Sequence, residues 1–164
     1  MSKKLYIVRH AKSSWDYEDI SDIDRPLSLR GINDAGLMAD RLKSRRNIPS
    51  LIMTSPACRA LHTATIFART FNLPWEQLRI VEKMYPGSVD DMLKILEKVE
   101  NSYPSVMIFG HNPAFTEFAN YFLSQPVDNV PTAGVVALNF PGDNWKDLKH
   151  LQPVIEDFDF PKKV

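Results

Sequence analysis

The sequence predicts an α/β protein in which helices cover both faces of a mostly parallel sheet. Short apolar segments at 5–8, 51–53 and 105–109 contain β-branched residues and are typical of strands buried on both faces. An amphipathic segment with helical spacing comes between or after these strands. No long linker interrupts the pattern, so we predict a single domain over residues 1–164 with a three-layer α/β/α architecture.

Polar residues mark where the helices are expected to begin. Ser28 and Ser88 are predicted N-caps, and Ser55-Pro56 and Asn112-Pro113 each combine a polar cap with a proline in the first turn. The helices are expected at about 29–46, 56–71, 89–99 and 113–122.

The remaining segments are predicted to be loops and two late strands. A polar stretch at 11–27 is long for a loop in a small domain, which favours a functional role. Strands are expected at 133–140 and 145–151, joined by a turn at 141–143. The tail from Glu156 onward is expected to be a surface extension.

Composition excludes several classes of protein. The formal net charge is 0, so there is no basic footprint for nucleic acid. The single cysteine, Cys58, excludes an internal disulfide and a multi-cysteine zinc site, and we expect it to pack or to have no role. No apolar run reaches the roughly 18 residues of a membrane span, and the charged N-terminus does not resemble a signal peptide. We expect a cytoplasmic protein with neither nucleic-acid nor membrane partners.

Cationic and imidazole side chains follow the predicted strands. Arg9 and His10 end the first strand, Gly110-His111 follow a later one, and Arg59 lies in the first turn of a helix. The carboxyl ends of parallel strands meet at one sheet edge, where ligands bind and helix N-termini attract anions. Because guanidinium groups match phosphate oxygens in a bidentate way, the sequence predicts a phosphate site without metal.

Three segments also resemble a known family. They are RHAKSSWD at 9–16, SPACRA at 55–60 and GHNP at 110–113, which are similar to the signature segments of the histidine phosphatase superfamily. Found in this order and at these spacings, they are a specific signal, and the resemblance extends over about residues 4–125.

Further features resemble one branch of that superfamily. The RPLSLRG stretch at 25–31, the pair Met84-Tyr85 and the short chain look like SixA-type phosphohistidine phosphatases. The resemblance implies a phosphoglycerate mutase-like fold without a large cap domain. It also implies a reaction that uses no cofactor.

The resemblance implies roles for four residues. His10 would be the nucleophile and would become phosphorylated before water hydrolyses the intermediate. Arg9 and Arg59 would bind phosphoryl oxygens, and His111 would donate a further hydrogen bond. The arginines and the helix dipoles are expected to keep His10 neutral, as attack requires. Substrate contacts are expected from the residues Ser13, Lys12 and Asn112.

The sequence departs from better-known members of the superfamily at three positions. Ala11 stands where many have Gly, and Asp16 stands where mutase-like members have Asn in a phosphate contact. Asn112 stands where the acid phosphatase branch has an Asp that donates a proton. Glu82 is a candidate for that general acid. The alternative is that Glu82 is a loop carboxylate with no role in catalysis.

The missing proton donor favours a phosphoramidate substrate, because the nitrogen–phosphorus bond of phosphohistidine is already labile. The expected partner is therefore a phosphorylated substrate such as a histidine-phosphorylated signalling protein. The alternatives are a phosphomonoesterase for small molecules and a phosphate-binding module without catalysis.

Four other features have simpler interpretations. We expect His62 and His150 to be solvated, Trp15 to pack beneath the loop, and Asp24-Arg25 to form a pair that stabilises the loop.

Overall fold

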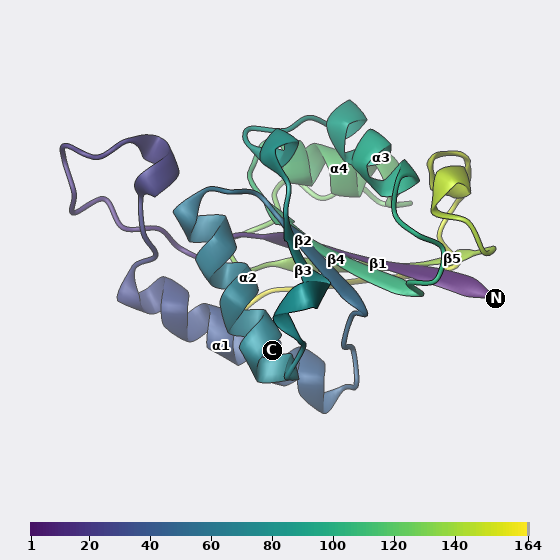
Figure 1. Ribbon diagram of the computed structural model, residues 1–164, viewed down its shortest axis with the longest axis horizontal. Helices are drawn as coiled ribbons and strands as arrows, with labels where there is room; N and C mark the ends of the chain where they lie inside the picture. Colours follow the sequence, from purple (N-terminus) through teal and green to yellow (C-terminus); the bar gives the residue numbers. More distant parts are fainter. Residues whose placement is uncertain (164) are drawn as a thin grey trace.

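The computed structural model describes residues 1–163, which form a six-stranded sheet with helices on both faces (Figure 1). The strands are β1 (Ser2–Arg9), β2 (Leu51–Thr54), β3 (Leu78–Ile80), β4 (Ser105–Gly110), β5 (Val135–Pro141) and β6 (Ile155–Asp159). The helices are α1 (Leu29–Ser44), α2 (Cys58–Phe71), α3 (Val89–Glu97) and α4 (Ala114–Phe122). The predicted three-layer α/β/α architecture is confirmed, and the described residues include no large cap domain.

The strand order is β3-β2-β4-β1-β5-β6, which places β1 near the middle of the sheet. The pairings β3-β2, β2-β4 and β4-β1 are parallel, whereas β1-β5 and β5-β6 are antiparallel. In the parallel pair, Arg9 of β1 lies opposite Gly110 of β4. The residues that follow these two positions therefore emerge side by side at one edge of the sheet.

Each face of β1 contributes to a separate hydrophobic cluster. Leu5 and Ile7 pack in the layer that contains α3 and α4, while Tyr6 and Val8 pack in the layer that contains α1 and α2. All four side chains are buried. Each contributes about 1.5–3 kcal/mol to folding, which explains why the strand is a continuous apolar run rather than an alternating one.

The C-terminal region differs from the prediction. Residues Trp145–His150 form a 3-10 helix rather than a strand, because the buried Trp145 ring donates its indole N–H to the Tyr103 carbonyl at 2.9 Å. The last strand is β6, in the stretch predicted to be a surface tail. The sequence of β6, IEDFD, is mostly acidic, and two arginines that bind its last residue lie far away along the chain. Arg41 of α1 and Arg45, the residue that follows this helix, both bind the buried Asp159 carboxylate, at 2.9 and 3.2 Å.

Two of the four predicted helix starts are confirmed and two are shifted. The Ser28 and Ser88 side chains accept hydrogen bonds from Gly31 and Asp91, as N-caps do. However, α2 begins at Cys58 and α4 at Ala114, so neither Ser55 nor Asn112 is the N-cap. The Ser55 side chain is instead used in the site described below.

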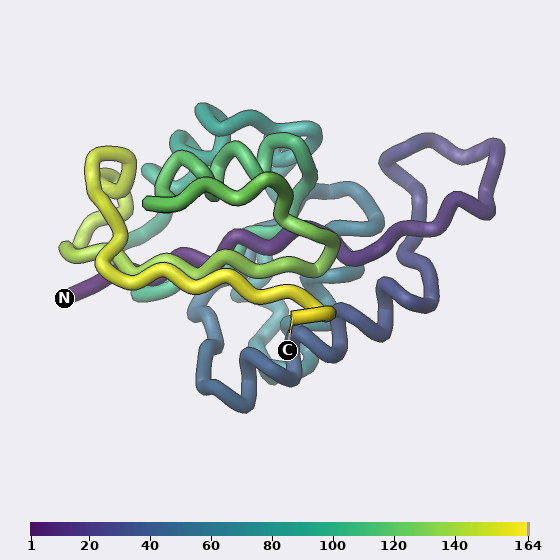
Figure 2. Tube along the Cα trace, turned by 180° about the vertical axis from the view of Figure 1, so that it is seen from behind, coloured from purple at the N-terminus to yellow at the C-terminus, as the bar shows by residue number. Residues whose placement is uncertain are grey.

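The segment between β1 and α1 extends away from the sheet (Figure 2). Its base is fixed by a bridge between Ser13 and Leu27 and by the Ser28 amide, which donates to the Lys12 carbonyl at 2.9 Å. Gly31 allows this close approach, since a β-carbon there would collide with the same carbonyl. Within residues 1–163, none of the helices combines the length and the apolar character that crossing a bilayer requires.

Candidate active site

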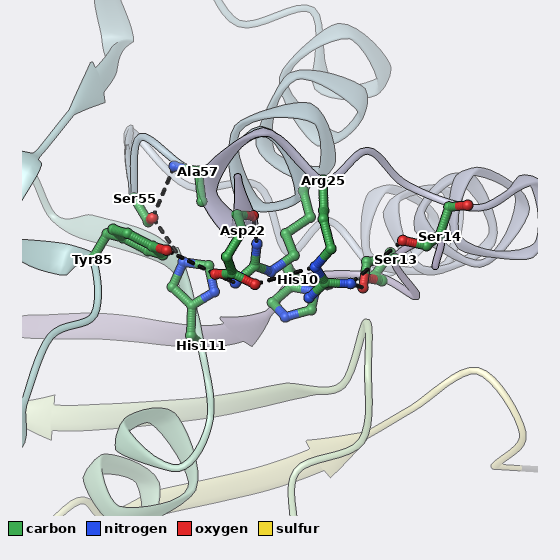
Figure 3. Close-up of polar contacts among 11 residues, drawn as sticks. His10, Ser13, Ser14, Asp22, Arg25, Ser55, Ala57, Tyr85 and His111 are labelled. Carbon is green, nitrogen blue, oxygen red and sulfur yellow. Dashed lines mark hydrogen bonds and ion pairs between the residues drawn. The ribbon is translucent and has the colours of Figure 1, made fainter. Parts of the chain in front are cut away.

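Two histidines and Arg59, from three distant segments, meet at the carboxyl edge of the sheet. Figure 3 shows His10 and His111 next to each other. The ring centroids of His10 and His111 are 5.2 Å apart. Arg59, from the first turn of α2, lines the same cavity, and all three side chains are buried. The spatial arrangement predicted from the sequence is thus present.

The His10 ring is held in one tautomer by the backbone. Its Nδ1 lies 2.7 Å from the Ala11 carbonyl oxygen, which can only accept, so Nδ1 carries the proton and Nε2 has a free lone pair. Burial, followed by the charges of Arg59 and Arg9, lowers the pKa of His10 to about 4, although the hydrogen bond to the Ala11 carbonyl opposes this shift. The direction agrees with the sequence-based expectation, but burial rather than the arginines is the largest cause. His10 is therefore neutral near pH 7 and has a nucleophilic nitrogen.

The second histidine is oriented by Ser55. The Ser55 hydroxyl oxygen accepts from the Ala57 amide at 3.1 Å and lies 2.7 Å from Nε2 of His111. The hydroxyl proton can therefore go to Nε2, which places the ring proton on Nδ1. That Nδ1 is buried and has no hydrogen-bond partner within residues 1–163. Burial, followed by the charges of His10 and Arg59, lowers the pKa of His111 to about 3, so it is a neutral donor.

A cavity of about 250 Å³ contains almost the whole predicted site. It is lined by the four predicted catalytic residues and by the three predicted substrate contacts, namely Arg9, His10, Arg59, His111, Lys12, Ser13 and Asn112. We call this cavity the cup. Glu82 is exposed and is not among its lining residues.

Sequence reasoning missed Arg25 as a member of the cup. Its Nη1 donates to the Ser13 hydroxyl at 2.7 Å, and its guanidinium lies 3.7 Å from the centre of the Trp15 ring. Trp15 is 72% exposed, so the prediction that it packs beneath the loop is wrong. The predicted pairing of Arg25 with Asp24 is also wrong, because the arginine pairs with Asp22 at 3.1 Å.

Asp22 is the second residue that the sequence did not indicate. Its carboxylate accepts from the Tyr85 hydroxyl at 2.7 Å and from Nη2 of Arg59 at 2.9 Å, and its backbone carbonyl accepts from Nη1 of Arg59 at 2.6 Å. The hydrogen bond from Tyr85, followed by those from Arg59 and Arg25, holds the pKa of Asp22 well below its usual range. Asp22 thus fixes the Arg59 guanidinium, whose buried Nε has no partner within residues 1–163.

A second cavity, of about 390 Å³, adjoins the cup. The two cavities share Arg59, His111 and Asn112. Tyr85 and Glu117 line the second cavity but not the cup, and the walls of the second cavity are more apolar than those of the cup. The Tyr85 and His111 ring centroids are 5.4 Å apart, so His111 lies between an aromatic wall and His10 (Figure 3).

The cup can hold a tetrahedral anion. Arg9, Arg25 and Arg59 supply positive charge, and the neutral His111 supplies a donor. Burial lowers the pKa of Arg9 as well, but an arginine keeps its proton in proteins. A neutral nucleophile beside fixed cations is the arrangement that phosphoryl transfer requires.

Comparisons with known proteins agree with this geometry. The family model described as "Histidine phosphatase superfamily (branch 1)" matches residues 5–93. The phosphohistidine phosphatase SixA of Escherichia coli is 29% identical over 112 residues, which are 67% of this chain and 68% of that protein. An uncharacterised Mycobacterium tuberculosis protein is 28% identical over 168 residues, covering 94% of this chain and 100% of its own length.

A solved structure is similar over nearly the whole chain. The crystal structure of SixA from Agrobacterium tumefaciens superimposes with a TM-score of 0.81 at 26% identity and covers 96% of this chain and 97% of that one. The expected phosphoglycerate mutase-like fold is thereby confirmed. The chain belongs to the histidine phosphatase superfamily, branch 1, and is SixA-like within it.

Proposed function

We propose that this protein is a phosphatase that removes the phosphoryl group from phosphohistidine on a protein by way of a phosphorylated His10. The family supports phosphatase activity in general. The observation that supports the covalent route is the tautomer of His10: its Nδ1 proton is held by the Ala11 carbonyl at 2.7 Å, which leaves Nε2 unprotonated in a cationic cup.

In the first step, the Nε2 lone pair of His10 attacks phosphorus in line with the bond that breaks. Arg9, Arg25 and Arg59 neutralise the charge on the phosphoryl oxygens, and the Nδ1–H of His111 donates to one of them. In the second step, water attacks the phosphorus of the adduct, and the electron pair of the breaking bond returns to Nε2. Both protons of the water stay on the phosphate product.

The choice of substrate depends on the leaving group. Asn112 cannot donate a proton, and Glu82 is exposed and does not line the cup. An ester alkoxide leaves poorly without a general acid, whereas an imidazole whose far nitrogen is protonated leaves as a neutral molecule. The residues at hand therefore favour a phosphoramidate over an ester.

An intermediate-trapping experiment tests the enzyme class. The protein would be mixed with a histidine-phosphorylated peptide labelled with ³²P, quenched in alkali to preserve phosphohistidine, and analysed for label on the protein. We expect label on the wild type and none on His10→Ala. An unlabelled wild type that still binds phosphate would support the alternative of a phosphate-binding module.

A substrate comparison tests specificity. We expect kcat/KM for the phosphohistidine peptide to exceed that for phosphoserine and phosphotyrosine peptides of the same sequence. A clear preference for esters would support a phosphomonoesterase instead.

A further inference from the structure

We propose that the 390 Å³ cavity beside the cup is a subsite for the imidazole ring of the substrate, with Glu117 as the counter-ion of the protonated far nitrogen. This inference rests on the proposed function and specifies how the leaving group is bound. We call the cavity the ring subsite.

The ring subsite has the place and the size for a leaving group. It shares Arg59, His111 and Asn112 with the cup but is not lined by His10, so it can receive the part of the substrate beyond phosphorus. A volume of about 390 Å³ lies in the usual range for small-ligand sites and exceeds what an imidazole fills. Tyr85 provides an aromatic wall for a flat ring.

The ring subsite contains carboxylates, which the cup lacks, in addition to the shared Arg59. Its lining includes two carboxylates, Asp22 and Glu117. Asp22 is already engaged by Tyr85, Arg59 and Arg25. Glu117 forms no ion pair within residues 1–163, so its charge is available to a ligand. A basic cup next to an acidic subsite matches a ligand with an anionic phosphoryl group and a cationic ring.

The chemistry of the transfer explains why such a counter-ion is useful. The reaction exchanges a phosphoryl group between two imidazoles: one nitrogen–phosphorus bond forms at Nε2 of His10 while the other breaks at the substrate ring. The electron pair of the broken bond returns to the ring nitrogen. If the far nitrogen carries a proton, the ring leaves as neutral imidazole rather than as an anion.

His10, the other imidazole in the exchange, already has a proton on the nitrogen that is far from phosphorus. The Ala11 carbonyl holds the proton on the far nitrogen, Nδ1, of His10, at 2.7 Å. A near-symmetric exchange needs an oxygen acceptor on the substrate side as well, and Glu117 supplies one in the ring subsite. The carboxylate raises the pKa of the bound ring and so replaces the general acid that is missing at Asn112.

The test compares two substrates within each variant. N-phosphoimidazole and p-nitrophenyl phosphate would be assayed with the wild type, with Glu117→Gln and with Asp128→Asn. Asp128 is a matched control, because it is an exposed carboxylate in a neighbouring cavity that does not line the ring subsite. The ratio of the two kcat/KM values does not depend on the fraction of active enzyme.

We expect Glu117→Gln to lower this ratio by about three- to fivefold, since an exposed carboxylate contributes a modest ion-pair energy. Asp128→Asn should leave the ratio unchanged. In the wild type the ratio should fall as pH rises through the pKa of the substrate ring. In Glu117→Gln that fall should begin at a lower pH, a shift that a structural role would not produce.

The outcomes separate this inference from the proposed function. If the wild type favours N-phosphoimidazole but Glu117→Gln changes neither the ratio nor its pH dependence, the subsite is overturned and the proposed function stands. If the wild type favours p-nitrophenyl phosphate, both are overturned. If Glu117→Gln and Asp128→Asn lowered the ratio of the kcat/KM values equally, the effect would come from general charge, and the assignment of Glu117 would also be overturned.

Discussion

The active site is built from two regions that are held in different ways. His10 and His111 follow the parallel strands β1 and β4, and the His10 amide donates to the Gly110 carbonyl at 3.0 Å. Asp22 and Arg25 come from the segment between β1 and α1, which extends away from the sheet (Figure 2). The first region is positioned by backbone pairing, and the second by contacts among side chains.

The two regions are therefore expected to have different roles in the reaction. The strand-end histidines are neutral because they are buried, and their tautomers are set by the Ala11 carbonyl and the Ser55 hydroxyl. In the loop, Asp22 instead orients the guanidinium of Arg59, which lines the cup and is expected to contact the substrate. Substitutions in the strand-end region should therefore reduce the rate of reaction, whereas substitutions in the loop should mainly change substrate affinity.

The largest effect is expected from removing the nucleophile. His10→Ala should lower kcat by about a thousandfold or more, because the variant lacks the nitrogen on which the proposed covalent intermediate forms. Stopped-time assays with a phosphohistidine peptide would measure this. His150→Ala is the matched control, since that histidine is exposed and distant in sequence from the cup. Retention of more than a tenth of the activity in His10→Ala would contradict the covalent route.

Arg59→Ala should have the second largest effect, lowering kcat/KM by about a hundredfold. The estimate follows from the loss of one preorganised donor to a transition-state oxygen, about 3 kcal/mol. The control is Arg69→Ala, which removes an exposed arginine from the same helix. Equal losses in the two variants would mean that general charge, rather than Arg59, accounts for the effect.

Ser55→Ala should lower kcat by about tenfold with little change in KM. Without the hydroxyl, the His111 ring loses the bond that places its proton on Nδ1. Ser55→Thr, which keeps a hydroxyl, should restore part of the rate. An unchanged kcat in Ser55→Ala would exclude this role for the hydroxyl.

Asp22→Asn should have a smaller effect, raising KM by about three- to fivefold. The amide keeps an acceptor for Tyr85 or Arg59 but loses the charge that holds the arginine. The control is Asp19→Asn, an exposed carboxylate in the same loop. If kcat fell in Asp22→Asn while KM stayed constant, the distinction between the two regions would not hold.

The last prediction concerns stability against pH rather than turnover. The folded-state pKa values of His10 and His111 are lowered to about 4 and about 3, below the usual 6.5. Between these values and 6.5 the unfolded chain binds more protons than the folded protein, so the free energy of unfolding should decrease as pH falls through this window. Urea unfolding at about pH 7 and pH 5 would measure the difference. His10→Asn should reduce this difference in the free energy of unfolding between about pH 7 and pH 5, and His150→Asn should leave it unchanged.

The strand-end region could be predicted from the sequence because its signals are local. An apolar run that ends in Arg9-His10 and another that ends in Gly110-His111 indicate two strand ends, and parallel pairing brings them together. The direction of the His10 pKa shift could also be predicted, although the larger part of it comes from burial.

The loop region could not be predicted in the same way. Asp22 is one of several carboxylates between residues 16 and 24, and its role depends on contacts with Tyr85 and Arg59 far along the chain. Ser55 was interpreted as a helix cap because the sequence gives no indication that its hydroxyl reaches His111. The late strand β6 could not be predicted for a similar reason, since the buried Asp159 binds Arg41 and Arg45, which are far away along the chain.

The position of β1 in the sheet also limits how early this strand can pair with its neighbours during synthesis of the chain. The strand that ends beside His10 is synthesised before both of its neighbours, because β4 and β5 begin at Ser105 and Val135. The ribosome must therefore release most of the chain before β1 has both partners, and folding must close long loops to reach the native state. An amino-terminal fragment that ends before β4 would contain His10 without the Gly110 carbonyl to which the His10 amide donates.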